Sequence, residues 1–145
     1  MRSGRSRVST ALAVQLLAAL SVLLLIGCAP GRAELDGTEW RLTEWTLSSL
    51  SPRDFHITAL FAEGTVSGHS GVNSYSGPYT LGPGNAFAIG AIASTEMAGP
   101  APAMRAEGAY LTLLGQARSY RVEAGRLTLF DAGGNESLIF EAAKR

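Results

Sequence analysis

The stretch VSGHSGVNSYSGPY, from Val66 to Tyr79, places three glycines and four serines around one histidine, one asparagine and two tyrosines. Its first half resembles the start of a G-x-S-x-G nucleophile elbow with Ser70 as the nucleophile. An elbow needs glycine two residues after the serine, but position 72 is valine, and residues 73–81 alternate like a strand where a helix should follow. We therefore interpret the stretch as bent strand. Its bends are assigned to positive φ or close backbone approach at Gly68, Gly71 and Gly77, and to a turn capped by the Asn73 side chain.

Short alternating segments lie on both sides of this stretch. In TEWRLTEW, residues 38–45, Trp40 and Leu42 alternate with polar residues, which is typical of a strand with one buried face. FHITALF, residues 55–61, puts its odd-numbered residues on one face, and Glu63-Gly64 joins it to residues 65–68 in a predicted hairpin. Further strands are expected over residues 74–81, 86–89, 92–95, 119–123, 126–130 and 136–140, with the clearest turn at 82–85.

One segment has a helical period. From Pro102 to Ala117 the spacing of Met104, Tyr110, Leu111 and Leu114 fits one apolar stripe among good helix formers. The prolines just before and at its start suit a helix entrance, where a missing N–H costs little. The sequence therefore predicts a mostly β domain of about eight antiparallel strands and one α-helix. The sheet is expected to close into a small barrel, with the helix over one opening and no exposed edges.

The N-terminal segment has the layout of an export signal. Arg2, Arg5 and Arg7 precede an apolar run over residues 11–26, and the run ends in Leu25-Ile26-Gly27-Cys28, which resembles the bacterial lipobox. We expect residues 1–27 to be a lipoprotein signal peptide, residues 28–34 to be the lipidated Cys28 and a tether, and residues 35–143 to be one domain. The alternative is an uncleaved anchor helix with an incidental cysteine. The expected location is the bacterial cell envelope, with the protein exported and membrane-anchored through Cys28.

The charge and the cysteine content of the chain exclude one class of partner and one kind of covalent bond. The chain has 12 basic and 12 acidic residues, and loss of the three signal-peptide arginines leaves nine basic residues, a formal charge of −3. Nucleic acid is therefore not an expected partner. Cys28 is the only cysteine, so no intramolecular disulfide can form.

The order and spacing of several motifs resemble the META/HslJ family. The resemblance rests on Gly37-Thr38-Glu39-Trp40, on the opening stretch, on Thr95-Glu96-Met97-Ala98, on Glu107 and on Leu127-Thr128-Leu129. The family motif positions carried over as structural are Gly37, Thr38, Trp40, Gly68, Gly71, Asn73, Tyr75, Gly77, Tyr79, Thr95, Met97 and Glu107. The resemblance implies a small bacterial envelope domain, often a lipoprotein, with a lipocalin-like barrel, a link to stress response or motility, and no catalytic residues.

The chain departs from the family pattern at two positions. Members usually carry cysteine where this chain has Val72 and Gly99. The resemblance implies that these cysteines pair in relatives and that this chain has lost the bridge, with Val72 recovering part of the lost stability by apolar contact and Gly99 recovering none.

Other side chains admit a functional or a structural interpretation. His56 and His69, with Glu63, could ligate a metal, but nothing fixes their spacing, so we interpret them as exposed strand histidines and expect no metal site. The aromatic residues Trp40, Trp45, Tyr75 and Tyr79 could line a ligand cavity, but in a small barrel they more often fill the core. For Glu107, a satisfied contact at the barrel mouth and a solvated helix face are both open.

These patterns favour a protein that is not an enzyme and has no cofactor, since no phosphate loop or cofactor fingerprint is present. The expected function is a non-catalytic binding or stress-related role in the envelope, with an unidentified envelope protein or small ligand as partner. The alternative is a lipoprotein inhibitor of a cell-wall hydrolase, similar to lysozyme inhibitors, which present a Ser-Gly-rich loop. A carrier of a small apolar ligand is a third hypothesis.

Overall fold

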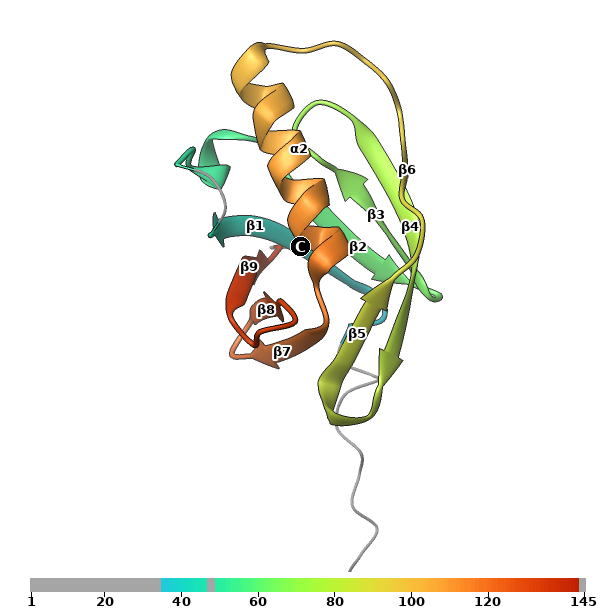
Figure 1. Cartoon of the computed structure of the whole chain (residues 1–145). Helices are drawn as coiled ribbons and strands as arrows, with labels where there is room; N and C mark the ends of the chain where they lie inside the picture. The colour runs from blue at the N-terminus through green and yellow to red at the C-terminus, as the bar shows by residue number, and fades with distance from the viewer. Residues whose placement is uncertain (1–34, 47–48, 144–145) are drawn as a thin grey trace, which may run out of the picture.

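The computed structural model describes residues 35–46 and 49–143, and the predicted signal peptide and Cys28 lie outside them (Figure 1). These residues form nine strands, one α-helix and two short 3-10 helices. The strands are β1 (Thr38–Trp45), β2 (Thr58–Ala62), β3 (Thr65–His69), β4 (Ser74–Gly82), β5 (Ala86–Ile89), β6 (Ala93–Ser94), β7 (Ser119–Glu123), β8 (Arg126–Phe130) and β9 (Glu136–Ala142); the helices are η1 (Pro52–Asp54), η2 (Pro83–Asn85) and α2 (Ala101–Gln116).

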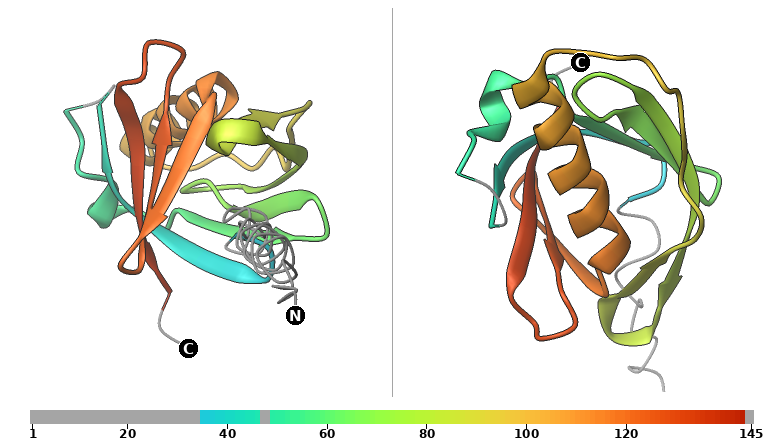
Figure 2. Two further views of the ribbon diagram at one scale, coloured as in Figure 1. Left: turned by 90° about the horizontal axis from the view of Figure 1, so that it is seen from below. Right: turned by 45° about the horizontal axis from the view of Figure 1, so that its top comes forward.

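Eight of the strands close into an antiparallel barrel. Around the barrel the order is β3-β2-β1-β9-β8-β7-β5-β4, and β4 pairs again with β3. The ninth strand, β6, pairs with the first part of β4 beside β5. Helix α2 lies across the open side between the β7–β9 strands and the β4–β5 strands (Figure 2). The predicted barrel of about eight strands with one covering helix is confirmed.

The barrel interior is filled by side chains from the inward faces of the strands. In β2 and just before it, Ile57, Ala59 and Phe61 are fully buried, as the alternation predicts. Trp40, Tyr75 and Tyr79 are also core residues, and Trp45 is half-buried against the core. The rings of Phe61 and Tyr79 meet edge to face with centroids 5.1 Å apart. The core interpretation of these aromatic residues therefore fits the structure better than a cavity lining.

The helix is close to its predicted bounds, but one residue of the predicted apolar stripe, Met104, is exposed. Met104 is 37% exposed, whereas Tyr110 and Leu114 are fully buried. At 100° per residue, Met104 lies in line with the half-buried Leu111, at the margin of the covered face. The buried face instead runs through Ala106, Glu107, Tyr110, Leu113 and Leu114. In the described part of the chain, no helix has both the length and the apolar character that a membrane span requires.

Two predicted strands are shorter in the structure. Strand β6 covers only Ala93–Ser94, and the residues just before it lie close against Gly77, where a Cβ would be 3.3 Å from the Ala91 carbonyl oxygen. Strand β2 begins at Thr58, because Phe55 closes the 3-10 helix η1 by donating its N–H to the Pro52 carbonyl. Because Gly77 has no side chain, the segment at Ala91 can lie directly against it.

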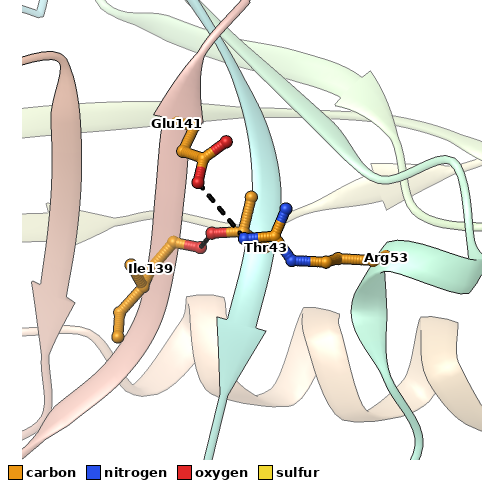
Figure 3. A network of polar contacts seen from close by, with 4 residues as sticks. All are labelled: Thr43, Arg53, Ile139 and Glu141. Carbon is orange, nitrogen blue, oxygen red and sulfur yellow. Dashed lines mark hydrogen bonds and ion pairs between the residues drawn. The ribbon is translucent and has the colours of Figure 1, made fainter.

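A bulge in β1 is satisfied by its own side chain. The β1–β9 register shifts between Leu42 and Glu44, and the Thr43 side chain turns inward. Its hydroxyl donates to the Ile139 carbonyl at 3.1 Å, so the disturbed ladder keeps a bond (Figure 3). Nearby, Arg53 of η1 pairs with Glu141 of β9 at 3.2 Å, and because both side chains are more than half exposed this pair adds little stability.

Candidate functional site

The family motifs meet at a buried polar cluster formed by Ser70, Asn73, Thr95, Met97 and Glu107, called the Glu107 cluster below. Glu107 projects from the buried face of α2 and is only 7% exposed. One carboxylate oxygen accepts from the Ser70 hydroxyl at 2.6 Å and from the Asn73 and Val72 N–H groups at 2.8 and 3.4 Å. The other accepts from the Asn73 side-chain amide at 2.8 Å. Glu107 therefore fastens the helix to the turn between β3 and β4.

The turn is shaped to receive this carboxylate. The Ser70 N–H donates to the Asn73 carbonyl at 2.8 Å, which directs the N–H groups of residues 72 and 73 toward the helix. Gly71 has φ +118, and a Cβ there would lie 3.5 Å from the Ala103 carbonyl oxygen of the helix. The prediction of a positive φ or a close backbone approach at Gly71 is confirmed.

Asn73 links the turn to a third segment. Its side-chain oxygen accepts from the Thr95 hydroxyl and from the Met97 N–H, both at 2.7 Å, and its amide also donates to the Met97 carbonyl at 3.2 Å. The predicted role as a local turn cap is wrong, because these bonds reach residues 22 to 24 positions away. Asn73 instead holds the chain after β6 against the start of β4.

The carboxylate of Glu107 is stabilised as an anion by hydrogen-bond donors. Burial would raise its pKa, but hydrogen bonds from Ser70, from Asn73 and from the backbone of Asn73 and Val72 outweigh burial and leave the pKa below its ordinary value. The satisfied-contact hypothesis for Glu107 thus fits the geometry, and the solvated-face hypothesis does not. All of the donors belong to the chain itself, so the carboxylate is occupied by structural bonds.

A second buried polar pair lies beside the cluster. The hydroxyl oxygens of Tyr75 and Tyr110 are 2.5 Å apart, and Tyr75 donates to the Thr58 carbonyl at 3.0 Å. Tyr110 must therefore donate to Tyr75. Burial raises the pKa of both phenols, so both stay protonated.

The order of donation in this pair predicts unequal effects of two similar substitutions. Tyr75→Phe removes the bond to Thr58 and leaves the Tyr110 hydroxyl without its acceptor, so we expect a loss of about 1–3 kcal/mol. Tyr110→Phe removes only a donor, and we expect a loss of about 0.5–1.5 kcal/mol. Urea unfolding of residues 29–145 measures both. A larger loss for Tyr110→Phe would contradict the assigned direction.

Ser70 does not have the environment of a nucleophile. It is fully buried, and its hydroxyl lies between the Glu107 carboxylate and the Asn73 carbonyl. His69, its neighbour in sequence, is exposed on the opposite face of the strand. The structure thus agrees with rejection of the elbow.

The remaining motif residues serve the barrel elsewhere. At the start of β1, Gly37 has φ +75 and donates to the Phe61 carbonyl at 2.7 Å, while Thr38 accepts from the Trp40 indole at 2.7 Å. Gly68 approaches β2 so closely that a Cβ would lie 2.2 Å from the Thr58 carbonyl oxygen. The sequence places Tyr110 on the buried stripe of the helix, but it gives no local signal for the hydrogen bond between Tyr110 and Tyr75 or for the bond between Ser70 and Glu107.

Val72 and Gly99, the positions at which the family resemblance implies cysteine in relatives, are neighbours. A Cβ built on Gly99 would lie 3.3 Å from the Val72 Cβ and only 2.6 and 2.8 Å from its two methyl groups. The valine methyls thus occupy the space that a side chain at position 99 would need. Gly99 itself adds no side-chain contact, and the absence of a side chain at position 99 leaves this space to Val72.

Within residues 35–46 and 49–143, no three His, Cys, Asp or Glu side chains lie close enough together to hold a metal ion. Glu63, the third ligand considered from the sequence, lies at the β2–β3 turn with φ 51. Its backbone N–H donates to the Asp36 carboxylate. Fold and site together define a small closed antiparallel barrel whose covering helix is fastened by a buried carboxylate.

The chain belongs to the META domain family, whose model matches residues 33–144. No curated protein matches it. Among solved structures, a protein from Burkholderia xenovorans solved by NMR is 25% identical with a TM-score of 0.64, covering 100% of this chain and 96% of that one. A second NMR structure is 19% identical with a TM-score of 0.59, covering 75% and 92%. A DUF4847 family protein from Bacteroides vulgatus is 14% identical with a TM-score of 0.57, covering 78% and 97%. The last two share the fold.

Proposed function

We propose that this META domain is a lipid-anchored protein of the bacterial envelope that acts by binding or supporting other envelope components, without catalytic turnover and without a cofactor. The observation that carries the proposal is the Glu107 cluster. Its buried carboxylate and buried serine are the groups from which chemistry would be expected, yet the chain's own donors and acceptors use both of them. A site whose polar groups bond to one another and which is almost closed to solvent serves structure rather than reaction.

The proposed anchor places the domain close to a membrane surface. Six residues separate Cys28 from Leu35, the first described residue, and a fully extended chain of that length spans about 20 Å. Acylation of Cys28 would therefore keep the barrel within a short reach of the bilayer, where envelope proteins are the available partners. A stress-related role is part of the same proposal and rests on the family resemblance.

The anchor and the partner can be tested together in the cell that makes the protein. With the full chain, we expect a fatty-acid label on the protein and its recovery in the membrane fraction, and crosslinking should capture specific envelope components. The variant Cys28→Ser should lose the label and the membrane association. A label that persists in this variant would contradict the anchor, and conversion of a captured molecule into a product would contradict the non-catalytic role.

The hydrolase-inhibitor alternative needs the Ser-Gly-rich stretch to be presented to a partner. Ser70 is fully buried and Tyr75 is 3% exposed, so these two side chains are not presented to a partner, although His69, Ser74 and Ser76 are exposed. We therefore expect residues 29–145 to leave lysozyme activity unchanged in an inhibition assay. Potent inhibition would favour the alternative. The carrier hypothesis has its own check, because native mass spectrometry of the purified protein would reveal the mass of a bound small molecule.

A further inference from the structure

The chain has two histidines, and the fold brings them together. The rings of His56 and His69 have centroids 5.3 Å apart and planes tilted by 54°, and both side chains are exposed. We propose that His56 and His69 form a surface site for a divalent transition-metal ion of the kind that imidazole binds, Zn²⁺ or Cu²⁺. From the sequence these two residues were interpreted as exposed strand histidines without a metal, because nothing fixed their spacing; their adjacency in the fold is the new observation.

The ring separation matches what a shared metal requires. Metal–nitrogen bonds of roughly 2.0–2.1 Å, with the ring centre roughly 1.1 Å behind the nitrogen, put two rings on a tetrahedral metal roughly 5.2 Å apart, and two rings at a right angle roughly 4.5 Å apart. The observed 5.3 Å is close to the tetrahedral value.

The backbone under the two histidines is held in place. Ile57 and Ser70 form an antiparallel bridge and are both fully buried, so their neighbours His56 and His69 point outward on the same face. The His69 N–H donates to the Thr58 hydroxyl at 3.1 Å. Gly68 lies against the Thr58 carbonyl, where a Cβ would be only 2.2 Å away. The backbone that carries the two histidines is thus positioned before metal binds, which lowers the entropy cost of chelation.

The site has two protein ligands. Because no set of three metal-ligating side chains occurs in the described part of the chain, water or a donor from a partner would complete the coordination. Imidazole suits Cu²⁺ and Zn²⁺, and affinities at such sites rise from Zn²⁺ to Cu²⁺. The inference is independent of the buried Glu107 cluster and of the proposed function.

Titration calorimetry of the full chain in detergent, with Zn²⁺ and separately with Cu²⁺, tests the site. We expect one ion per chain, and His56→Gln and His69→Gln should each weaken binding by about tenfold or more, because either variant converts a chelate into a single contact. The double variant has no histidine and gives the background, while Cys28 is the same in every protein. Glu123→Gln, an exposed carboxylate on β7, is the matched control and should bind like the wild type.

A thermal readout separates metal binding from a folding defect. Metal that binds only the native state raises the melting temperature, and the rise grows with the logarithm of the affinity, so the wild type should be stabilised by each ion and the double variant should not. The unliganded variants should melt like the wild type, because both histidines are exposed. Wild-type affinity no higher than that of the double variant, loss in only one of the two single variants, or equal loss in Glu123→Gln would overturn the proposal.

Discussion

Replacing Glu107 by alanine is expected to destabilise the domain by about 3–5 kcal/mol, because the substitution leaves several buried donors without an acceptor. The Ser70 hydroxyl, the Asn73 N–H and the Asn73 amide all donate to this carboxylate at 2.6 to 2.8 Å. Such a loss is a large part of the stability of a typical small domain. Urea unfolding of residues 29–145 at neutral pH, followed by circular dichroism, measures it.

Glu107→Gln separates charge from shape. The glutamine oxygen can replace one carboxylate oxygen, but its NH₂ group must then face another donor in the cluster, the Asn73 amide or the Ser70 and Asn73 donors. We expect a loss of about 1.5–3 kcal/mol, smaller than for alanine. Glu123→Gln removes an exposed carboxylate on β7 and should change stability by less than about 0.5 kcal/mol.

The pH dependence follows from the direction of the Glu107 pKa. Because the folded-state pKa lies below the ordinary value of 4.5, the ionised carboxylate contributes stability above about pH 4.5, and this contribution is lost as pH falls through the folded-state pKa. The gap in unfolding free energy between the wild type and Glu107→Gln should therefore narrow in acid. A gap that stays constant from pH 7 to pH 3 would contradict an anionic structural role for Glu107.

The fold was predictable because its signals are local. Trp40 and Leu42, like Ile57 and Phe61, share one face of a strand and alternate with residues of the other face, which identifies the inward faces. The glycine-rich turns separate the strands. Once about eight short strands are placed, closure of the sheet removes the exposed edges. The helix over residues 101–116 was equally predictable, because the spacing of its apolar residues changes to a helical period and can be recognised without tertiary information.

The polar cluster was not predictable in the same way. Apolar periodicity assigns Met104 to the buried stripe and gives no reason to bury Glu107, because a carboxylate is buried only where donors meet it. Those donors come from residues 34 to 37 positions away, and the partners of Asn73 lie a further segment along the chain. The family resemblance marked these positions, but only the three-dimensional contacts show what each side chain does.

The effect of the glycine at position 99 depends on its neighbour Val72. Considered alone, a glycine in place of cysteine contributes no packing. The structure couples it to Val72, whose methyl groups stand 2.6 and 2.8 Å from where a Cβ at position 99 would lie. We expect Gly99→Ala alone to destabilise the domain by about 1–3 kcal/mol through overpacking, and Val72→Ala to relieve part of that loss in a double-mutant cycle.

Joint substitution of Val72→Cys and Gly99→Cys is expected to introduce a stabilising disulfide. The 3.3 Å between the two Cβ positions is a few tenths of an ångström below the usual disulfide range, so a small backbone shift suffices. Replacing valine by cysteine also removes the two methyl groups that would clash with a side chain at position 99. The local geometry therefore favours the pair although it disfavours Gly99→Cys alone.

The expected gain is about 2–4 kcal/mol, and the chain-entropy relation for a loop closed between positions 72 and 99 gives about 3.5 kcal/mol. For a domain of this size the gain corresponds to a rise in melting temperature of roughly 10 °C. The measurement compares residues 29–145 of the wild type and the double variant with and without reductant, since this segment lacks Cys28 and no third thiol competes. Reductant should abolish the gain in the double variant and leave the wild type unchanged. Two free thiols in a folded, oxidised double variant would contradict the assigned adjacency, whereas a bridge without stabilisation would show that native strain offsets the entropic gain.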